Sequence, residues 1–237
     1  MSFESFVLRW NLFWSKAVQP VFYEKIIEGL QNTFLIAVIG FAIGFLLGTV
    51  LAVFKLLPSN SKVGKVLSTF ADIYIAIFRG TPMVVQLLVA YYVLLPLFAL
   101  KAPALTVAEI MFGLNSAAYV CEIMRSGILS VDHGQMEAGR SVGLTYMQTM
   151  FRIVFPQAIK NILPTLGNEL IMLIKETSVV SLVGATDLFC AFQYIGNNNY
   201  EYMIPYLMMA AIYIVVIVIL TLLIKLLERR MRASDKR

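Results

Sequence analysis

The residues best suited to chemistry are charged side chains that interrupt long apolar stretches. Glu169 and Glu176 lie in the apolar stretch from about residue 157 to 183. Their spacing places both on nearly the same face of a helix, with Glu169 roughly 18 Å along it and close to the middle of a membrane. Because a charge at that depth normally faces a cavity or a partner, we expect Glu169 to contact an ammonium or guanidinium group. The alternative is an inter-helix hydrogen bond or salt bridge, and Asn168 adds polar atoms beside either arrangement.

A second candidate is the Arg79-Gly-Thr-Pro82 stretch. Gly80 weakens a helix, Thr81 is a suitable N-cap, and Pro82 suits a first helical position better than an interior one. We therefore expect the long apolar segment to break at Gly80. The new helix would begin with free N–H groups inside the membrane, where Arg79 adds positive charge. Such half-helix ends bind substrate carboxylates in transporters, although a purely structural kink is the alternative. Gln86 would line the same path.

Metal and nucleotide chemistry find little support. The chain has one histidine, His133, and two cysteines, Cys121 and Cys190, without metal-ligand or disulfide spacing. It contains no GxxxxGK[ST] phosphate loop, so we expect neither a cofactor nor an ATP site of its own. The sequence shows no nucleophile–base pair that would indicate a membrane enzyme, although buried glutamates could act as catalytic groups in one.

Composition indicates an integral membrane protein. Hydrophobic residues make up 59% of the 237 residues and charged residues only 14%, and the mean hydropathy is +0.80. Soluble domains average about 25% charged residues. The net charge of +5 does not indicate nucleic acid, because the basic residues lie between apolar runs rather than among aromatics on one face. We expect a lipid bilayer, and no nucleic acid, around this chain.

Apolar runs predict five membrane spans in an all-α, polytopic fold. About twenty apolar residues cross a bilayer, and the runs Gly29–Phe54 and Tyr202–Ile224 contain no charge. Three further spans carry charges and cover about residues 66–97, 104–125 and 157–183. We divide the chain into an N-terminal interfacial amphipathic segment, a transmembrane domain with a loop over 126–156, and a basic tail, covering residues 1–22, 23–228 and 229–237.

Basic residues then predict the sidedness. With the N-terminus outside, the outer segments hold few of the 19 lysines and arginines: Arg9, Lys16, Lys25 and Lys101. Most others fall in inner loops and the C-terminal tail. The positive-inside rule therefore places the N-terminus outside and both the C-terminus and the 126–156 loop in the cytoplasm.

The inner loop has the features of a helix that another protein grips. Asp132 is a suitable N-cap and Gln135 can return its hydrogen bond, which predicts a helix over about 132–150. Ala138, Gly139 and Gly143 supply small side chains, and two glycines in a helix cost about 1 kcal/mol each. Because Gly139 and Gly143 would share a face, we expect that face to let another protein approach the backbone.

This loop resembles a known motif. Glu137-Ala138-Gly139, then Gly143, then Ile153-x-Phe155-Pro156 is similar in type and spacing to the EAA loop of bacterial ABC importer permeases. Gly139 replaces the family's second alanine and Phe155 its leucine. The resemblance implies a coupling helix seated in a groove of an ATPase subunit. It assigns that contact to the residues of the loop's core: Glu137, Ala138, Gly139, Gly143 and Leu144.

Other stretches resemble the polar amino-acid branch of these permeases, whose members include histidine, arginine, glutamine and cystine permeases. The similar segments are Phe78-Arg-Gly-Thr-Pro-Met-Val-Val-Gln86, Ser116-Ala-Ala-Tyr119, Pro164-x-Leu-Gly-Asn168-Glu169 and Lys175-Glu-Thr-Ser178. The resemblance implies a transport subunit, not an enzyme, of a bacterial inner membrane. It would work with two ATPase subunits that bind ATP and magnesium, a second identical or related permease chain, and an external substrate-binding protein. The alternatives are a secondary transporter and a permease for a solute that is not an amino acid.

Overall fold

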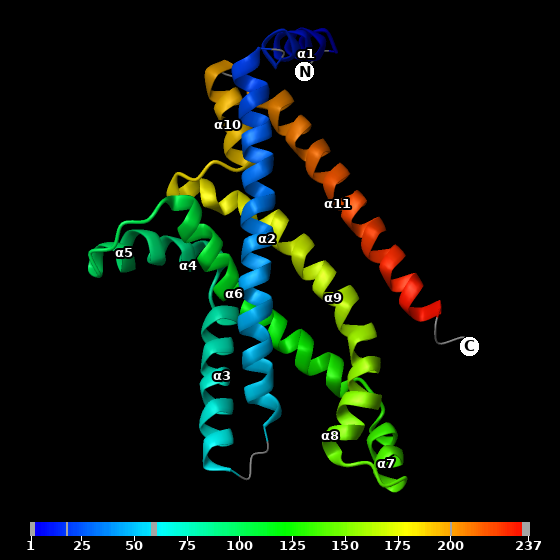
Figure 1. Cartoon of the computed structure of the whole chain (residues 1–237). Coiled ribbons are helices and arrows are strands. Elements are labelled where there is room, and N and C mark those ends of the chain that lie inside the picture. Colours follow the sequence, from blue (N-terminus) through cyan, green and yellow to red (C-terminus); the bar gives the residue numbers. More distant parts are fainter. Residues whose placement is uncertain (1–2, 18, 58–60, 200, 234–237) are drawn as a thin grey trace. The chain divides into compact units, whose positions relative to one another are not determined.

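The computed structural model describes residues 3–17, 19–57, 61–199 and 201–233. Every regular element in these ranges is helical, as predicted (Figure 1). The order is α1 (Phe3–Ala17), α2 (Pro20–Leu56), α3 (Lys62–Gly80), α4 (Met83–Val89), π-helix η1 (Ala90–Leu94), α5 (Leu95–Leu97), α6 (Ala104–Leu129), α7 (His133–Ser141), α8 (Tyr146–Thr149), π-helix η2 (Met150–Val154), α9 (Phe155–Glu176), 3-10 helix η3 (Thr177–Val183), α10 (Leu188–Asn199) and α11 (Met203–Ala233).

Within the described residues, three helices are long and apolar enough to cross a membrane, and two interrupted helix pairs raise the number to as many as five. The single helices are α2, α6 and α11. One interrupted pair breaks between Gly80 and Met83, where the sequence predicts a break. The other continues past Val183 into α10, a short helix that the sequence analysis missed. The last helix extends to Ala233, into the predicted basic tail, and residues 1–2 and 234–237 of the predicted terminal segments lie outside the described residues.

The contacts divide the chain into two units. Unit 1 comprises residues 1–40, 83–112 and 173–219, and unit 2 comprises residues 41–82, 113–172 and 220–237. Helices α2, α6, α9 and α11 each contribute to both units.

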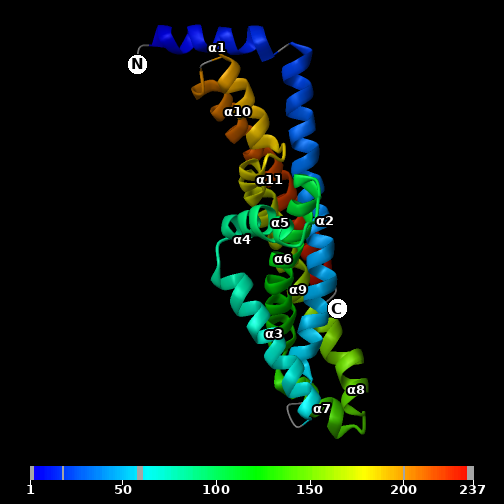
Figure 2. The same cartoon turned by 90° about the vertical axis from the view of Figure 1, so that its left-hand side faces the viewer.

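Unit 1 is held by an apolar cluster that joins α1, α2, α10 and α11. Its buried members are Phe13, Phe22, Leu188, Phe192, Ile195 and Ile204. Two side chains of α2 fasten the start of α10: Asn32 donates to the Thr186 carbonyl oxygen at 2.8 Å, and the Thr33 hydroxyl accepts from Leu188 N–H at 3.1 Å. Figure 2 shows α1 ending near the start of α2 and extending sideways from it, with α10 beneath α1.

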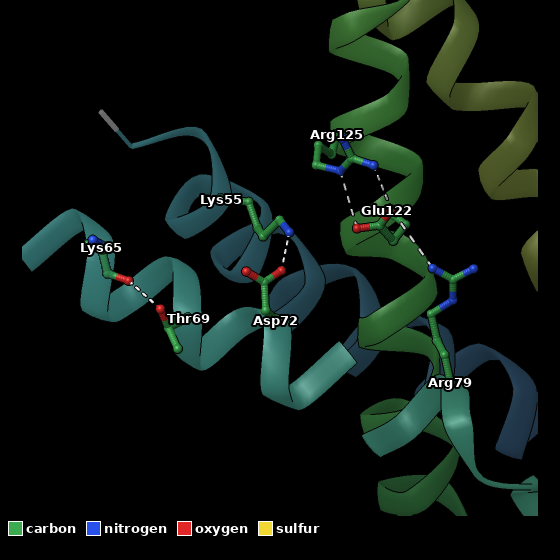
Figure 3. Close-up of polar contacts among 7 residues, drawn as sticks. All are labelled: Lys55, Lys65, Thr69, Asp72, Arg79, Glu122 and Arg125. Atoms are coloured by element: carbon green, nitrogen blue, oxygen red, sulfur yellow. Dashed lines mark hydrogen bonds and ion pairs between the residues drawn. The ribbon is translucent and has the colours of Figure 1, made fainter. Parts of the chain in front are cut away.

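Unit 2 is built on close helix contacts at small residues. A Cβ added at Gly48 of α2 would lie 2.7 Å from the Ala117 carbonyl oxygen, and one added at Gly127 of α6 would lie 2.2 Å from Ile162 Cγ1 of α9. One buried cluster joins α2, α3 and α6, and another joins α6, the loop after it and α9. The helix α3 lies alongside the end of α2, where Lys55 and Asp72 form an ion pair (Figures 1 and 3). These contacts hold the predicted site residues of unit 2.

Candidate functional site

The loop between α6 and α9 begins with the predicted helix. Asp132 is the N-cap of α7, and its carboxylate accepts from Gly134 N–H at 2.7 Å. Glu137 and Ala138 lie on the exposed side of α7, whereas Gly139 is buried. Gln157 of α9 donates to the Gln135 side-chain oxygen at 3.2 Å, which fastens α7 to the following span.

The expected continuous helix over 132–150 is wrong, because the chain turns at Gly143. α7 ends at Ser141, and Gly143 has a φ of +88°, a conformation that glycine adopts at little cost. The Leu144 N–H then donates to the Gly139 carbonyl oxygen at 3.2 Å. Thr145 and Gln148 form a capping box that starts α8. Gly139 and Gly143 therefore share no helix face, and Gly143 serves the turn.

Packing within this chain requires a glycine at position 139. A Cβ at this position would lie 2.4 Å from Thr149 Cγ2 and 3.1 Å from Ile153 Cδ1. The glycine lets α7 pack closely on α8 and η2 of its own chain. The expectation that Gly139 offers its backbone to another protein is thus replaced by an intramolecular role. Glu137, Ala138 and Gly143 are exposed, and Leu144 is partly buried.

An exposed apolar tip surrounds this turn, and the sequence analysis missed it. Val142 is 77% exposed, and Tyr146 and Met147 are 52% and 58% exposed. We call these three residues the loop tip. Large apolar side chains gathered at an exposed, well-capped turn are typical of a protein-contact surface. The sequence signals that could have located it are Gly143 and the capping-box pattern of Thr145 and Gln148.

Glu169 lies buried in α9 of unit 2. It is 6% exposed, and its Oε1 accepts a hydrogen bond of 2.9 Å from the Ser116 hydroxyl of α6. A Cβ at Gly44 of α2 would lie 2.6 Å from Ser116 Cβ, so three helices meet here. This is the inter-helix hydrogen bond that the sequence left open, and a substrate contact by Glu169 stays a prediction. The neighbouring Asn168 is exposed.

Arg79 lies in the last turn of α3 and is exposed. Its guanidinium is 5.5 Å from the centre of the Tyr119 ring, and its Nη1 is 3.9 Å from Glu122 Oε2. Arg125 holds the same carboxylate more closely, with hydrogen bonds of 2.9 and 3.3 Å (Figure 3). Arg79 is therefore the weaker partner of Glu122 and presents a cation at the end of α3.

The chain breaks directly after Arg79. Thr81 is the C-cap of α3, and its hydroxyl donates to the Ile77 carbonyl oxygen at 2.8 Å. The next helix begins at Met83, so Pro82 precedes it instead of occupying its first position. A Cβ at Gly80 would meet nothing within 4 Å. The break is thus confirmed, but the expected roles of Thr81 and Pro82 are wrong, because Thr81 caps the end of α3 and the next helix begins at Met83.

The remaining predicted residues belong to unit 1. Gln86 is partly buried on α4, which packs against η3, and Glu176 is the partly buried last residue of α9. Glu169, Asn168, Arg79 and Thr81 belong to unit 2. The residues predicted for the substrate path therefore belong to different units. Four residues of unit 2 contact the predicted ones and were not themselves predicted for the path: Ser116, Tyr119, Glu122 and Arg125.

No group of three or more His, Cys, Asp or Glu side chains within the described ranges is arranged to hold a metal ion. Cys121 is buried, Cys190 is partly buried, and both are free thiols.

Comparisons with known proteins give a consistent result. The family described as binding-protein-dependent transport system inner membrane component matches residues 44–233. The arginine transport system permease protein ArtQ of Bacillus subtilis (strain 168) is 38% identical over 210 residues, covering 89% of this chain and 94% of ArtQ. The L-cystine transport system permease protein TcyB of the same organism is 36% identical over 215 residues, covering 90% of this chain and 89% of TcyB. A chain in the crystal structure of an amino acid ABC transporter with histidines is 39% identical, with a TM-score of 0.80 over 97% of this chain and 99% of that one.

Proposed function

Because the chain belongs to the family of binding-protein-dependent transport system inner membrane components, we propose that it is the permease subunit of an ATP-binding-cassette importer for a polar amino acid or a close derivative such as cystine. The relatives named for arginine and cystine support this substrate class. So does the 39% identical chain from an amino acid ABC transporter. The chain forms one side of the membrane path and uses ATP hydrolysed by a partner.

The observation that carries this proposal is the capped and closely packed loop of α7, Gly143 and α8. Capping at Asp132 and Thr145 fixes both short helices, and Gly139 lets them pack together. The loop tip presents apolar side chains, with Glu137 and Ala138 also exposed nearby on α7. A stiff apolar projection of this kind can transmit force from an ATPase subunit to the attached spans α6 and α9. A secondary transporter, the alternative, needs no such projection.

The substrate path in this proposal uses opposite charges of unit 2. Glu169 supplies an anion for the substrate ammonium group, and Arg79 supplies a cation for its carboxylate. Arg79 suits this role because it is exposed and Glu122 is already bound by Arg125. Asn168 and Thr81 of the same unit are proposed to line this path, and Gln86 and Glu176 of unit 1 stay predicted substrate-path residues.

The assembly and its orientation follow from the same reasoning. The N-terminus lies outside and the C-terminus inside, because most basic residues then face the cytoplasm. Two ATPase subunits hold ATP and magnesium, a second permease chain completes the path, and an external binding protein delivers the substrate. Residues of the α7–α8 loop face an ATPase subunit in the cytoplasm of a bacterial cell.

Co-purification tests this coupling. A tagged full-length chain should bring down an ATPase subunit from native membranes, and Val142→Asp should abolish that, because it places a charge in an apolar contact. Glu137→Lys should do the same by reversing a charge on α7. His133→Asp is the matched control, since it adds the same negative charge at another exposed position of α7. An ATPase retained by Val142→Asp, or absent from the wild-type preparation, contradicts the proposed contact.

A further inference from the structure

The first helix, α1, has three faces with different neighbours. One face packs on unit 1: Phe13 is 4% exposed within the apolar cluster, and Phe6 packs against that cluster. Arg9 lies on the same face by helical spacing, and its Nη1 is 3.4 Å from Glu201 Oε1. Because this face packs on unit 1, it determines the directions in which the other two faces of α1 point.

The second face is an apolar stripe formed by Phe3, Val7, Trp10 and Trp14. Helical spacing places these residues in one row, and each is exposed, by 81%, 39%, 38% and 43%. The Trp10 and Trp14 rings pack edge to face with centroids 5.8 Å apart. We call this row the aromatic stripe. Four large apolar side chains exposed in one row indicate an apolar neighbour for this face.

The third face is polar. Glu4, Asn11 and Ser15 form a row next to the aromatic stripe, on the side away from the protein core, and all three are exposed. Leu8 and Leu12, which are 73% and 44% exposed, border this row on the side opposite the aromatic stripe. Apolar and polar rows side by side along one helix are suited to a boundary between hydrocarbon and water.

The neighbouring span indicates that this apolar neighbour is lipid. The chain passes from α1 into α2 within three residues. The first turns of α2 carry the exposed carboxylates Glu24 and Glu28, whereas Leu35 and Val38, inside the predicted span, are 43% and 53% exposed. The helix α1 therefore joins the polar end of a span whose exposed surface becomes apolar further along. Tryptophan and tyrosine are enriched at this depth. We propose that α1 lies flat in the water–lipid interface, with the aromatic stripe inserted among the lipid chains.

Glu201 fixes the position of α1 relative to α11. Its two carboxylate oxygens accept from Met203 N–H at 3.0 Å and Ile204 N–H at 3.2 Å, which caps the start of α11. The same carboxylate pairs with Arg9. One side chain therefore holds α1 beside the start of the last span, so α1 anchors the starts of both the first and the last span at one membrane surface.

The sequence permits a direct test, because its two tryptophans are both in the aromatic stripe. Tryptophan fluorescence of the purified full-length chain, reconstituted in phosphatidylcholine vesicles, reports on α1 alone. We expect strong quenching by lipids brominated near the headgroups, weaker quenching by lipids brominated near the chain ends, and little quenching by aqueous iodide. Emission quenched by iodide and not by brominated lipid would overturn the proposal, since it places α1 in water. Emission quenched by neither would also overturn it, since it places the stripe against protein.

Matched variants assign the effect to the stripe. Val7→Asp adds a charge to the aromatic stripe and should cause a large loss of quenching by the shallow brominated lipid. Asn11→Asp adds the same charge to the polar row and should leave the quenching unchanged. Equal losses in both variants, or none in Val7→Asp, contradict the assignment of the faces. Neither result depends on transport, so the proposal stands or falls separately from the importer function.

Discussion

The hydroxyl of Ser116 on α6 donates a 2.9 Å hydrogen bond to Oε1 of Glu169 on α9. Ser116 has no exposed surface, and Glu169 is 6% exposed. A buried carboxylate is stable only where hydrogen bonds or opposite charges satisfy it. This pair therefore ties two spans together at the residue that the proposed importer needs as its anionic group.

Ser116→Ala should destabilise unit 2. It removes a donor to a buried carboxylate, a change that costs about 1–3 kcal/mol, and a lower thermal unfolding temperature in detergent would show it. Ser126→Ala is the control on the same helix, because that exposed hydroxyl donates to the Ile123 carbonyl oxygen of its own turn. Equal unfolding temperatures for Ser116→Ala and Ser126→Ala would show that the hydrogen bond contributes nothing.

Glu169→Gln separates the charge of this residue from its hydrogen bond. The amide can still accept from Ser116, so we expect the complex to assemble normally, but the anion for a substrate ammonium group is gone. Stimulation of ATP hydrolysis by substrate and binding protein should then be lost, as it should in Glu169→Ala. Glu109→Gln, which removes a partly buried carboxylate of α6 in unit 1, is the control. Full stimulation of the Glu169→Gln complex would remove this charge from the site.

The packing of the coupling loop predicts a suppressor. Gly139→Ala places a methyl group 2.4 Å from Thr149 Cγ2, and such overpacking costs about 1–3 kcal/mol. We expect weaker co-purification of the ATPase subunit, because α7 and α8 can no longer hold their geometry. Adding Thr149→Ser removes the clashing methyl group and should restore part of the binding. If the single variant binds normally, or the double variant is worse, Gly139 has a different role.

Arg125 should influence substrate affinity through Glu122. Arg125→Ala frees the Glu122 carboxylate to pair more closely with Arg79, which now lies 3.9 Å away. The substrate concentration for half-maximal stimulation should therefore rise, whereas Glu122→Gln should lower it or leave it unchanged. Lys65→Ala removes an exposed charge elsewhere on unit 2 and is the control. The expected result is a rise for Arg125→Ala and no rise for Glu122→Gln, and a rise in both variants would contradict a substrate role for Arg79.

Much of the fold follows from local sequence patterns. Uninterrupted apolar runs locate α2 and α11, because a bilayer requires them. The Gly80-Thr81-Pro82 break is visible because proline and glycine act on the backbone itself. The start of α7 is equally local, since Asp132 caps it. These features depend on a few neighbouring residues and on no distant contact.

The features that were missed depend on competing signals or on distant residues. The spacing of Gly139 and Gly143 fits a single helix, but Thr145 and Gln148 start a new one. The chain therefore forms a turn at Gly143 instead of a continuous helix. The short helix α10 is held by Thr33 of α2, far away in the sequence. The Ser116–Glu169 hydrogen bond and the ion pair of Glu122 with Arg79 also join residues that are far apart in the sequence. No local pattern specifies which helix faces meet, so these partners appear only in the folded chain.

Uptake in proteoliposomes tests the central claim most directly. Vesicles containing the purified permease and ATPase subunits, with binding protein and a labelled polar amino acid outside, should accumulate the label only when ATP is enclosed. Accumulation should be unaffected when ion gradients are collapsed with ionophores. Uptake by the permease chain alone, driven by an imposed ion gradient and indifferent to ATP, would contradict the account and identify a secondary transporter.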